Sequence, residues 1–370
     1  MRALLLAAIL LAAIGCAEER PAAPTYHANE NPDRLSDWGM VTTTKDALVL
    51  GEKVTPYDLA TPLFSDYAKK LRTVWLPDGQ AAQYHTTQSF DFPVGAVITK
   101  TFYYPQQSEH WDGVVSARET PPLTDGVLPL DGLRLIETRV LVHRANGWAA
   151  LPYVWNDEQT DAVLKRAGAM ERLSLVRDEN RVEEFAYIVP NANQCAGCHA
   201  SDATTKAIQP IGPKARHLNK KSTIIADTNQ LDHWREAGLL TGDITLPAPQ
   251  NADWRDETFA LDARARAYLD INCSHCHNPN GPADTSGLNL EPDAAHAALG
   301  LCKLPIAAGS GTGGRLYDIV PGDPDRSITV FRMETTDPGA MMPELGRSVS
   351  HEEGVRLITE WIAEMTGGCG

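Results

Sequence analysis

The sequence predicts an α+β multidomain protein, in which a β-rich N-terminal domain is followed by a cysteine-bearing segment and by a mainly helical C-terminal domain. Three observations lead to this prediction. Runs of β-branched and aromatic residues gather within residues 37–190. Apolar residues at helical spacing mark both ends of residues 253–370. The length of 370 residues allows two or three domains, and 43% hydrophobic with 22% charged residues is typical of folded proteins.

The β-rich region, residues 37–190, contains no cysteine. Residues 94–104 are mostly β-branched or aromatic, which predicts a strand. Asn146-Gly147 separates the alternating run 135–142 from the run 148–155, and this pattern is typical of a hairpin. The region is also expected to contain a short helix at 157–168 and a strand at 182–189.

Helical spacing returns in the second half of the chain. Residues 229–240 predict one helix, and residues 245–252, with two prolines, read as a linker. Residues 256–271 place apolar side chains on one helical face, and residues 351–365 predict a final amphipathic helix. These patterns lead us to expect a mainly helical domain over 253–370.

The net charge of −15 bears on the class of partner. Nucleic acid is bound by basic faces that displace counterions, so we expect no nucleic-acid partner. Electrostatic docking on anionic lipid is disfavoured for the same reason. The charge fits an exported soluble body, or a protein partner that presents a basic patch.

The N-terminus has the pattern of an export signal. Arg2 precedes the apolar run 3–14, which is too short to span a bilayer as a helix. Cys16 follows Gly15 as in a bacterial lipoprotein processing site, so residues 1–16 are expected to be a signal that leaves Cys16 as the lipidated first residue. The alternative is an ordinary signal that leaves Cys16 as a thiol. The polar residues 17–36 then read as a linker.

A lipid anchor predicts where the protein resides. Each buried acyl methylene contributes roughly 0.8 kcal/mol, so several chains hold a protein firmly. Ala17, rather than an acidic residue, follows Cys16. This is consistent with onward transport, and we expect a protein anchored on the periplasmic side of the outer membrane.

Two five-residue motifs carry the most specific chemistry: Cys195-Ala196-Gly197-Cys198-His199 and Cys273-Ser274-His275-Cys276-His277. Two cysteines separated by two residues and followed by histidine attach haem c through two thioether bonds, and the histidine binds the iron. The alternatives are a redox dithiol and a zinc site. The two pairs of a zinc ribbon lie about 15–20 residues apart, and these pairs lie much farther apart. The sequence therefore predicts two covalently bound haem c groups, a first haem segment at 191–244 and a cytochrome c-like domain at 253–370.

The sixth iron ligand is predicted for the second haem only. Met342 precedes Pro343 in the region between the second motif and the last helix, and we choose it over its neighbour Met341. Packing is the alternative role for both. We also expect a backbone carbonyl within 278–282 to accept the ring N–H of His277.

The first haem has no methionine nearby, because none lies between residues 171 and 332. His217 is the leading candidate, and it follows basic residues that are able to pair with haem carboxylates. The remaining candidates are His233, Met40, Met170, His85, His110 and His143. If none of them binds, the iron is open to small molecules.

Seven cysteines are present, and Cys302 and Cys369 remain once Cys16 and the motif cysteines are assigned. In an oxidising compartment two leftover thiols are expected to pair as a disulfide.

Several runs outside the haem chemistry resemble a family of bacterial exported di-haem c-type cytochromes, which have a haem-free β-rich N-terminal region and two CxxCH sites. The resemblance covers nearly all of the mature chain. The runs that carry it, besides the two motifs, are TPLFSDY at 61–67, IETR at 136–139, NQ at 193–194, PIGPKAR at 210–216 and ARAYL at 265–269. The resemblance implies haem binding and electron transfer, and it names no substrate.

We therefore expect electron transfer between periplasmic or outer-membrane redox partners. The alternative is an enzyme, either a di-haem peroxidase-like protein or the haem subunit of a dehydrogenase complex. A third possibility is a binding or sensing module built on the β-rich domain. No glycine-rich phosphate loop and no Ser/His/Asp constellation stands out, so the carrier is preferred and enzymatic activity is left open.

Overall fold

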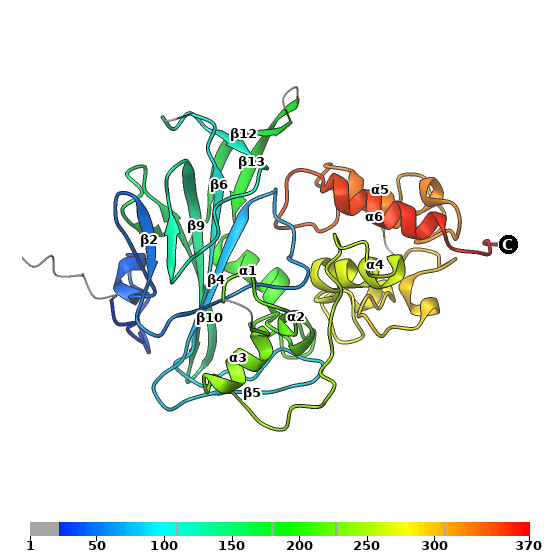
Figure 1. The fold of residues 1–370 in the computed structure, drawn as a ribbon. Helices are drawn as coiled ribbons and strands as arrows, with labels where there is room; N and C mark the ends of the chain where they lie inside the picture. Colours follow the sequence, from blue (N-terminus) through cyan, green and yellow to red (C-terminus); the bar gives the residue numbers. More distant parts are fainter. Residues whose placement is uncertain (1–21, 109, 179–180, 226–227, 307) are drawn as a thin grey trace, which may run out of the picture.

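The computed structural model describes residues 22–108, 110–178, 181–225, 228–306 and 308–370. Its centre is a six-stranded antiparallel sheet with the strand order β11-β10-β9-β6-β4-β3 (Figure 1). The strands are β3 (Thr55–Tyr57), β4 (Lys69–Trp75), β6 (Val97–Pro105), β9 (Leu133–Arg144), β10 (Gly147–Trp155) and β11 (Ala162–Leu164).

The hairpin predicted at Asn146-Gly147 is confirmed. Strands β9 and β10 pair from Arg144↔Gly147 outward, and Gly147 has a φ of 107°, which a glycine adopts without strain. The strands predicted at 94–104 and 182–189 are also confirmed. The helix expected at 157–168 is wrong, because this stretch contains a turn and β11. The Asn156 side chain accepts the N–H of Thr160 at 2.9 Å, which supplies a local alternative to helical hydrogen bonds.

One face of the central sheet packs against a small sheet of β1 (Val41–Thr43), β2 (Ala47–Leu50) and β8 (Val127–Pro129). The fully buried Trp38, in the 3₁₀ turn Leu35–Trp38, donates its indole N–H to the Tyr153 hydroxyl at 2.8 Å in this core. Residues 22–36 lie along the same core, and the Thr25 N–H donates to the Trp38 carbonyl at 2.9 Å.

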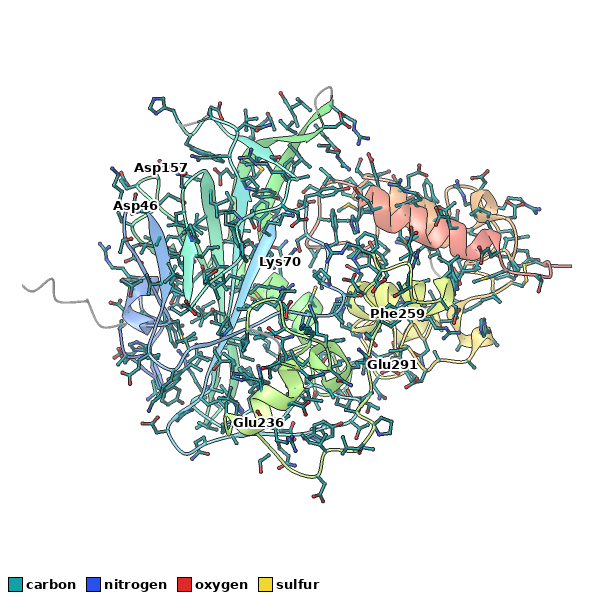
Figure 2. All side chains as sticks on the ribbon, in the orientation of Figure 1. Asp46, Lys70, Asp157, Glu236, Phe259 and Glu291 are labelled. Atoms are coloured by element: carbon teal, nitrogen blue, oxygen red, sulfur yellow. A yellow bond between two sulfur atoms is a disulfide. The ribbon has the colours of Figure 1, made fainter. Side chains whose placement is uncertain are left out.

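The other face of the central sheet is covered at both ends. At one end lie α2 (Ala215–Leu218), α3 (Gln230–Glu236), β5 (Ala82–Gln83) and β14 (Leu240–Thr241). At the other end lies the ribbon of β12 (Ala169–Asp178), β13 (Arg181–Val189) and β7 (Val114–Ser116). The helix predicted at 229–240 is present as α3, but it ends at Glu236, and Leu240 belongs to β14. Between the two ends, on strand β4, the face carries Lys70 (Figure 2).

The C-terminal part lies beside this face (Figure 1) and contains α4 (Leu261–Leu269), a π-helical turn (Asp270–Ser274), α5 (Ile328–Glu334) and α6 (Glu352–Ala363). The helices predicted at 256–271 and 351–365 are confirmed as α4 and α6, although α4 begins only at Leu261. Single 3₁₀ turns occupy Asp284–Ser286, His296–Leu299, Gly309–Thr312 and Pro324–Arg326.

The predicted fold class is wrong in one respect. The structure is β-rich, with 27% strand and 20% helix in several sheets, and it has no mainly helical C-terminal domain. Most of residues 275–327 are turns and loops. This stretch is rich in glycine, proline, asparagine and aspartate, which favour turns over helices and so separate the helices found at its two sides.

The run at 61–67 connects the sheet with the C-terminal part. Asp66 and Tyr67 both adopt left-handed backbone conformations, with φ of 48° and 61°. The Asp66 carboxylate accepts the N–H groups of Ser348 and Val349 at 2.6 and 2.9 Å. The Tyr67 hydroxyl donates to Glu353 on α6 at 2.6 Å.

Within the described residues, no helix combines the length and the apolar character needed to cross a membrane.

Candidate functional site

The first motif lies on a helix that begins directly after a strand. Strand β13 ends at Val189, and α1 (Ala192–His199) follows. The Asn191 side chain accepts the N–H of Gln194, and the Gln194 side chain accepts the N–H of Asn191, both at 2.9 Å. This reciprocal cap satisfies two N–H groups of the first turn, so the cysteines and His199 are held on a short, well-started helix.

The second motif follows a helix that changes its winding. Helix α4 passes into the π-helical turn at Asp270, and the Ser274 hydroxyl donates to the Asp270 carbonyl at 2.6 Å. Single π-helical turns are rare and concentrate at functional sites. The turn contains the half-buried Cys273, and Cys276 and His277 follow just beyond it.

The structure brings the two motifs together. The Cys276 sulfur lies 3.8 Å from the carbonyl oxygen of Gly197, and the two residues are 79 positions apart in the sequence. The four motif cysteines are free thiols. Both motifs therefore present free thiols to one region of the protein, and burial raises the pKa of each thiol.

A cavity with about 1080 Å³ of empty space opens at this junction. Cys195, Cys198 and Cys273 line it, and so does Met342. Its neighbour Met341 is buried elsewhere and does not line the cavity. The remaining lining is largely apolar and includes Leu63, Phe64, Ile188, Ile211, Met333 and Val355.

His199 has one ring nitrogen committed. Its Nδ1 lies 2.8 Å from the carbonyl oxygen of Gln209, so Nδ1 carries the proton and Nε2 keeps its lone pair. Burial lowers the pKa of His199 to about 4, and the nearby Lys100 charge adds to this effect. A neutral imidazole with a free Nε2 is the form that binds iron.

The Nδ1 of His277 is also hydrogen-bonded, in this case to a side chain. Its Nδ1 lies 3.0 Å from the Ser286 hydroxyl, which itself donates to the Ala283 carbonyl at 2.6 Å and therefore accepts from His277. Burial lowers the pKa of His277 to about 4. The expected backbone carbonyl within 278–282 is wrong. His277 and Cys276 are not among the residues that line the 1080 Å³ cavity.

A second cavity, with about 790 Å³ of empty space, lies between the central sheet and residues 211–213. Cys195 and His199 line this cavity as well as the first, and His217 from α2 lines only this one. The structure therefore brings His217 to the same cavity as His199.

Only one of the two ring nitrogens of His217 has a hydrogen-bond partner among the described residues. Its Nε2 lies 3.1 Å from the Asp270 carboxylate, whereas its buried Nδ1 has no hydrogen-bond partner among the described residues. Burial lowers the pKa of His217. An unpartnered buried nitrogen costs free energy unless a ligand binds it.

Asp270 ties the two motif regions together. The guanidinium of Arg216 binds both of its oxygens at 2.7 Å, and the amide of Asn251 donates at 2.7 Å. Burial alone would raise the pKa of Asp270, but the hydrogen bonds from Arg216 and His217 outweigh it and hold the pKa well below its usual range. Arg216 is thus occupied by a protein carboxylate, contrary to the expectation that it pairs with haem carboxylates.

The other residues that the sequence offered as ligands of an expected first haem line neither cavity. Met40 is fully buried in the far core, and the side chain of Met170 is 59% exposed. His85 pairs with Asp91 at 2.8 Å, and His143 stacks on Trp148. His110 is exposed and His233 is half-buried.

Sequence reasoning missed the cations of this site. Arg72, Lys100 and Arg139 line the smaller cavity, and Lys100, Arg139 and Arg347 line the larger one. They come from three different strands and a distant loop, so only knowledge of the strand register brings them together. His351, which also lines the larger cavity, was missed for the same reason.

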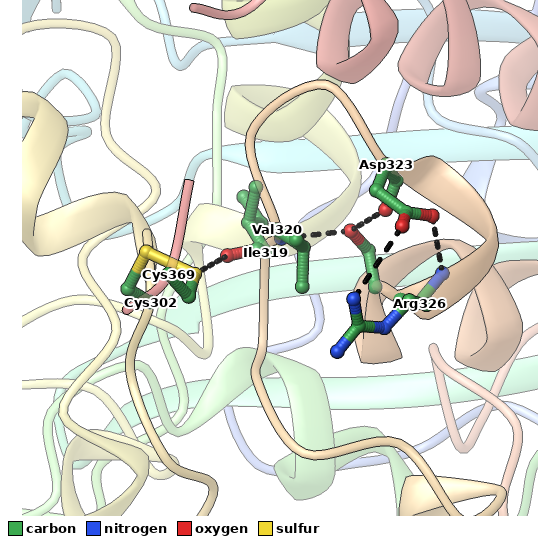
Figure 3. Close-up of a disulfide and its surroundings, with 7 residues drawn as sticks. Cys302, Ile319, Val320, Asp323, Arg326 and Cys369 are labelled. Carbon is green, nitrogen blue, oxygen red and sulfur yellow. Dashed lines mark hydrogen bonds and ion pairs between the residues drawn. A yellow bond between two sulfur atoms is a disulfide. The ribbon is translucent and has the colours of Figure 1, made fainter. Parts of the chain in front are cut away.

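The structure joins Cys302 and Cys369 in a disulfide, with 5.2 Å between their Cα atoms (Figure 3). The bond ties the loop after the second motif to the last residues of the chain. Cys16, the expected lipidation site, lies outside the described residues.

No family model matches this chain, and no curated protein or solved structure shows a significant match. Over the part of the chain that the structure describes, no three His, Cys, Asp or Glu side chains gather as ligands for a bare metal ion.

Proposed function

We propose that the chain is an exported di-haem c-type cytochrome that transfers electrons between periplasmic or outer-membrane redox partners. The observation that carries the proposal is the juxtaposition of two CxxCH motifs, of which the first motif and Cys273 of the second line a largely apolar cavity. All four thiols are free, and each terminal histidine is protonated on Nδ1. Bound haem supplies an iron that takes up and releases one electron.

The residues present fit two haem c groups. Cys195 and Cys198 would hold one porphyrin and Cys273 and Cys276 the other, and His199 and His277 would bind the irons through Nε2. The hydrogen bonds from Nδ1 to the Gln209 carbonyl and the Ser286 hydroxyl orient the two rings and raise the basicity of their Nε2 atoms. Met342 offers a thioether to the cavity that Cys273 lines.

A lipid anchor at Cys16 on the periplasmic side of the outer membrane belongs to the same proposal. It rests on the apolar run 3–14 and the cysteine that follows it. The net charge of −15 favours redox protein partners with a basic docking face, and it argues against nucleic acid.

A peroxidase-like enzyme is the second candidate. It is favoured by the space of about 790 Å³ beside His199, which leaves room for a small molecule. His217 decides between the two candidates: as an iron ligand it completes a carrier, and as an unbound group it is a potential acid–base residue. Rapid carbon monoxide binding to one reduced haem, together with peroxide turnover, favours the enzyme, whereas no binding favours the carrier.

Counting the haems tests the proposal directly. The chain, matured with the periplasmic haem-attachment machinery, should contain two c-type haems by pyridine haemochrome assay. Cys195→Ala with Cys198→Ala should remove one haem, and Cys273→Ala with Cys276→Ala the other. The matched control, Cys302→Ser with Cys369→Ser, should retain both. One haem in the unaltered chain, or bound zinc in place of haem, contradicts the proposal.

A further inference from the structure

Three cations form a row across the face of the central sheet that is turned toward the cavities. Arg72 on β4 lies opposite Lys100 on β6, and Lys100 lies opposite Arg139 on β9. Like charges at directly opposed positions of neighbouring strands repel each other. A row of this kind is therefore unfavourable unless anions neutralise it.

The protein itself neutralises only one member of the row. The guanidinium of Arg139 binds the fully buried Glu137 at 2.5 Å, and Glu137 also accepts the hydroxyl of Tyr187 at 2.7 Å. Among the described residues, no hydrogen bond or ion pair reaches the side chains of Arg72 and Lys100. Lys100 has only the ring of Phe102, whose centre lies 5.2 Å from its Nζ.

Burial makes the missing anion more costly. The side chain of Arg72 is nearly inaccessible to water, with the residue only 7% exposed. Burial lowers the pKa of Lys100 to about 7, and the charges of Arg139 and Arg72 lower it further. Burying an ammonium group without an anion beside it is unfavourable. The arrangement therefore points to a ligand that supplies the anion.

All three cations line the 790 Å³ cavity, next to Cys195 and His199. The rest of that lining is mainly apolar and includes Ile98, Leu141, Ala150, Ile211 and Ile271. A ligand that matches it has a flat or compact apolar body and carboxylates at one side.

We propose that Arg72, Lys100 and Arg139 bind carboxylate groups in this cavity, and that these are the propionates of the haem attached at Cys195 and Cys198. The inference rests on the proposed function and extends it, since it assigns the orientation of the first haem. Its carboxylates face the central sheet. A free small-molecule carboxylate would bind the same three cations. The experiment below distinguishes it from the haem propionates.

The midpoint potential of the first haem reports on this row. Cations beside the haem favour the ferrous state, because reduction adds negative charge. Lys100→Met and Arg72→Gln should therefore each lower the potential of one haem and leave the other unchanged. Lys100→Arg keeps the charge and should restore the potential. Spectroelectrochemical titration of the haem-loaded chain measures all of these variants.

Lys70→Met is the matched control. Lys70 lies on the same face, 5.6 Å from the centre of the Phe102 ring, and its Nζ donates to the Ala68 carbonyl at 3.0 Å. It lines neither cavity, so its replacement should leave both potentials unchanged. Lys100→Met removes a charge that repels its neighbours, so this variant should fold. If the Lys100→Met protein does not accumulate, Lys100→Gln gives the same comparison.

The outcomes are distinguishable from failure of the proposed function, because haem is counted first in every sample. Absence of haem from the unaltered chain refutes the proposed function. Two haems with potentials in Lys100→Met and Arg72→Gln equal to those of Lys70→Met refute the propionate assignment. Added succinate should not shift the spectrum of the unaltered chain. A succinate-dependent shift that Lys100→Met abolishes identifies the row as a site for free carboxylates and overturns the haem as the source.

Discussion

His199 and His277 share one arrangement although their partners differ. Each donates Nδ1–H to an oxygen supplied by a nearby loop, the Gln209 carbonyl in one case and the Ser286 hydroxyl in the other. Burial lowers both pKa values to about 4. Both rings are therefore neutral at neutral pH, with the lone pair of Nε2 available to a metal.

Met342 can be tested separately from its neighbour. Met342→His should lower the potential of one haem and remove the weak far-red absorption of thioether-bound iron, because imidazole favours ferrous iron less than thioether does. Met341→His is the control, since Met341 does not line the cavity. Redox titration with visible spectra measures both variants. Loss of the band in Met341→His alone would move the assignment by one residue.

Among single residues, the cysteines and histidines of the two motifs could be predicted from the sequence, but the residues that hydrogen-bond to them could not. The spacing of cysteine and histidine within five residues is local chemistry, so Cys195 and His277 were identified at once. Ser286 and Gln209 depend on how loops turn, and the row through Lys100 depends on strand register. No local pattern encodes either.

At the scale of elements, the segment 61–67 is held by hydrogen bonds to the central sheet and to the C-terminal part. The left-handed Asp66 directs its backbone carbonyl to the Tyr104 hydroxyl at 2.6 Å and its carboxylate to the backbone of Ser348 and Val349. Burial raises the pKa of Asp66 to about 6, although these backbone N–H groups oppose the shift. Folding therefore makes Asp66 easier to protonate than it is in the unfolded chain.

Asp66→Asn should remove a pH dependence of stability. The pKa of Asp66 is 3.8 when unfolded and about 6 when folded, so its favourable contribution is complete below pH 4 and is lost as pH rises through 6. The asparagine keeps the acceptor oxygen and tolerates a left-handed φ. The variant should gain up to about 3 kcal/mol over the unaltered chain at pH 7, with little difference at pH 4.

Urea unfolding of both proteins between pH 4 and 7 measures this difference. Subtraction of the two curves cancels the opposite contribution of His199, His277 and His351, whose pKa values are lowered. A gain of the unaltered chain over the variant with rising pH contradicts the assignment.

Elements were predictable where their pattern was long and regular. The hairpin around Gly147 and the helices α4 and α6 have clear periodicity, and all are present. The helix predicted at 157–168 is absent because the Asn156 side chain closes a turn there. The helix content of 253–370 was overestimated because the helical periodicity at its two ends carries no information about the loops between them. Sequence periodicity locates elements, and turn-forming side chains decide how far they run.

For the molecule as a whole, the disulfide closes the C-terminal part on itself. Cys302 and Cys369 are separated by 67 residues, and within this loop lie α5, α6 and Met342. In the chain-entropy model a loop of this length contributes roughly 4 kcal/mol, from which strain subtracts.

Cys302→Ser with Cys369→Ser should therefore lower the free energy of unfolding by up to about 4 kcal/mol while both haems remain attached. Thermal unfolding with and without dithiothreitol checks this prediction. The unaltered chain should lose stability on reduction and the double variant should not. Equal unfolding temperatures of the unaltered chain in both conditions contradict it.

The contacts of the segment 61–67 join residues that are far apart in the sequence. The Phe64 N–H donates to the Asn272 side chain at 2.9 Å across 208 positions, and the Tyr67 hydroxyl donates to Glu353 on α6 across 286 positions. Closing a long loop costs entropy before its contact can form, so contacts of this kind form late. The junction between the central sheet and the C-terminal part is therefore expected to be completed after each side has formed its local structure.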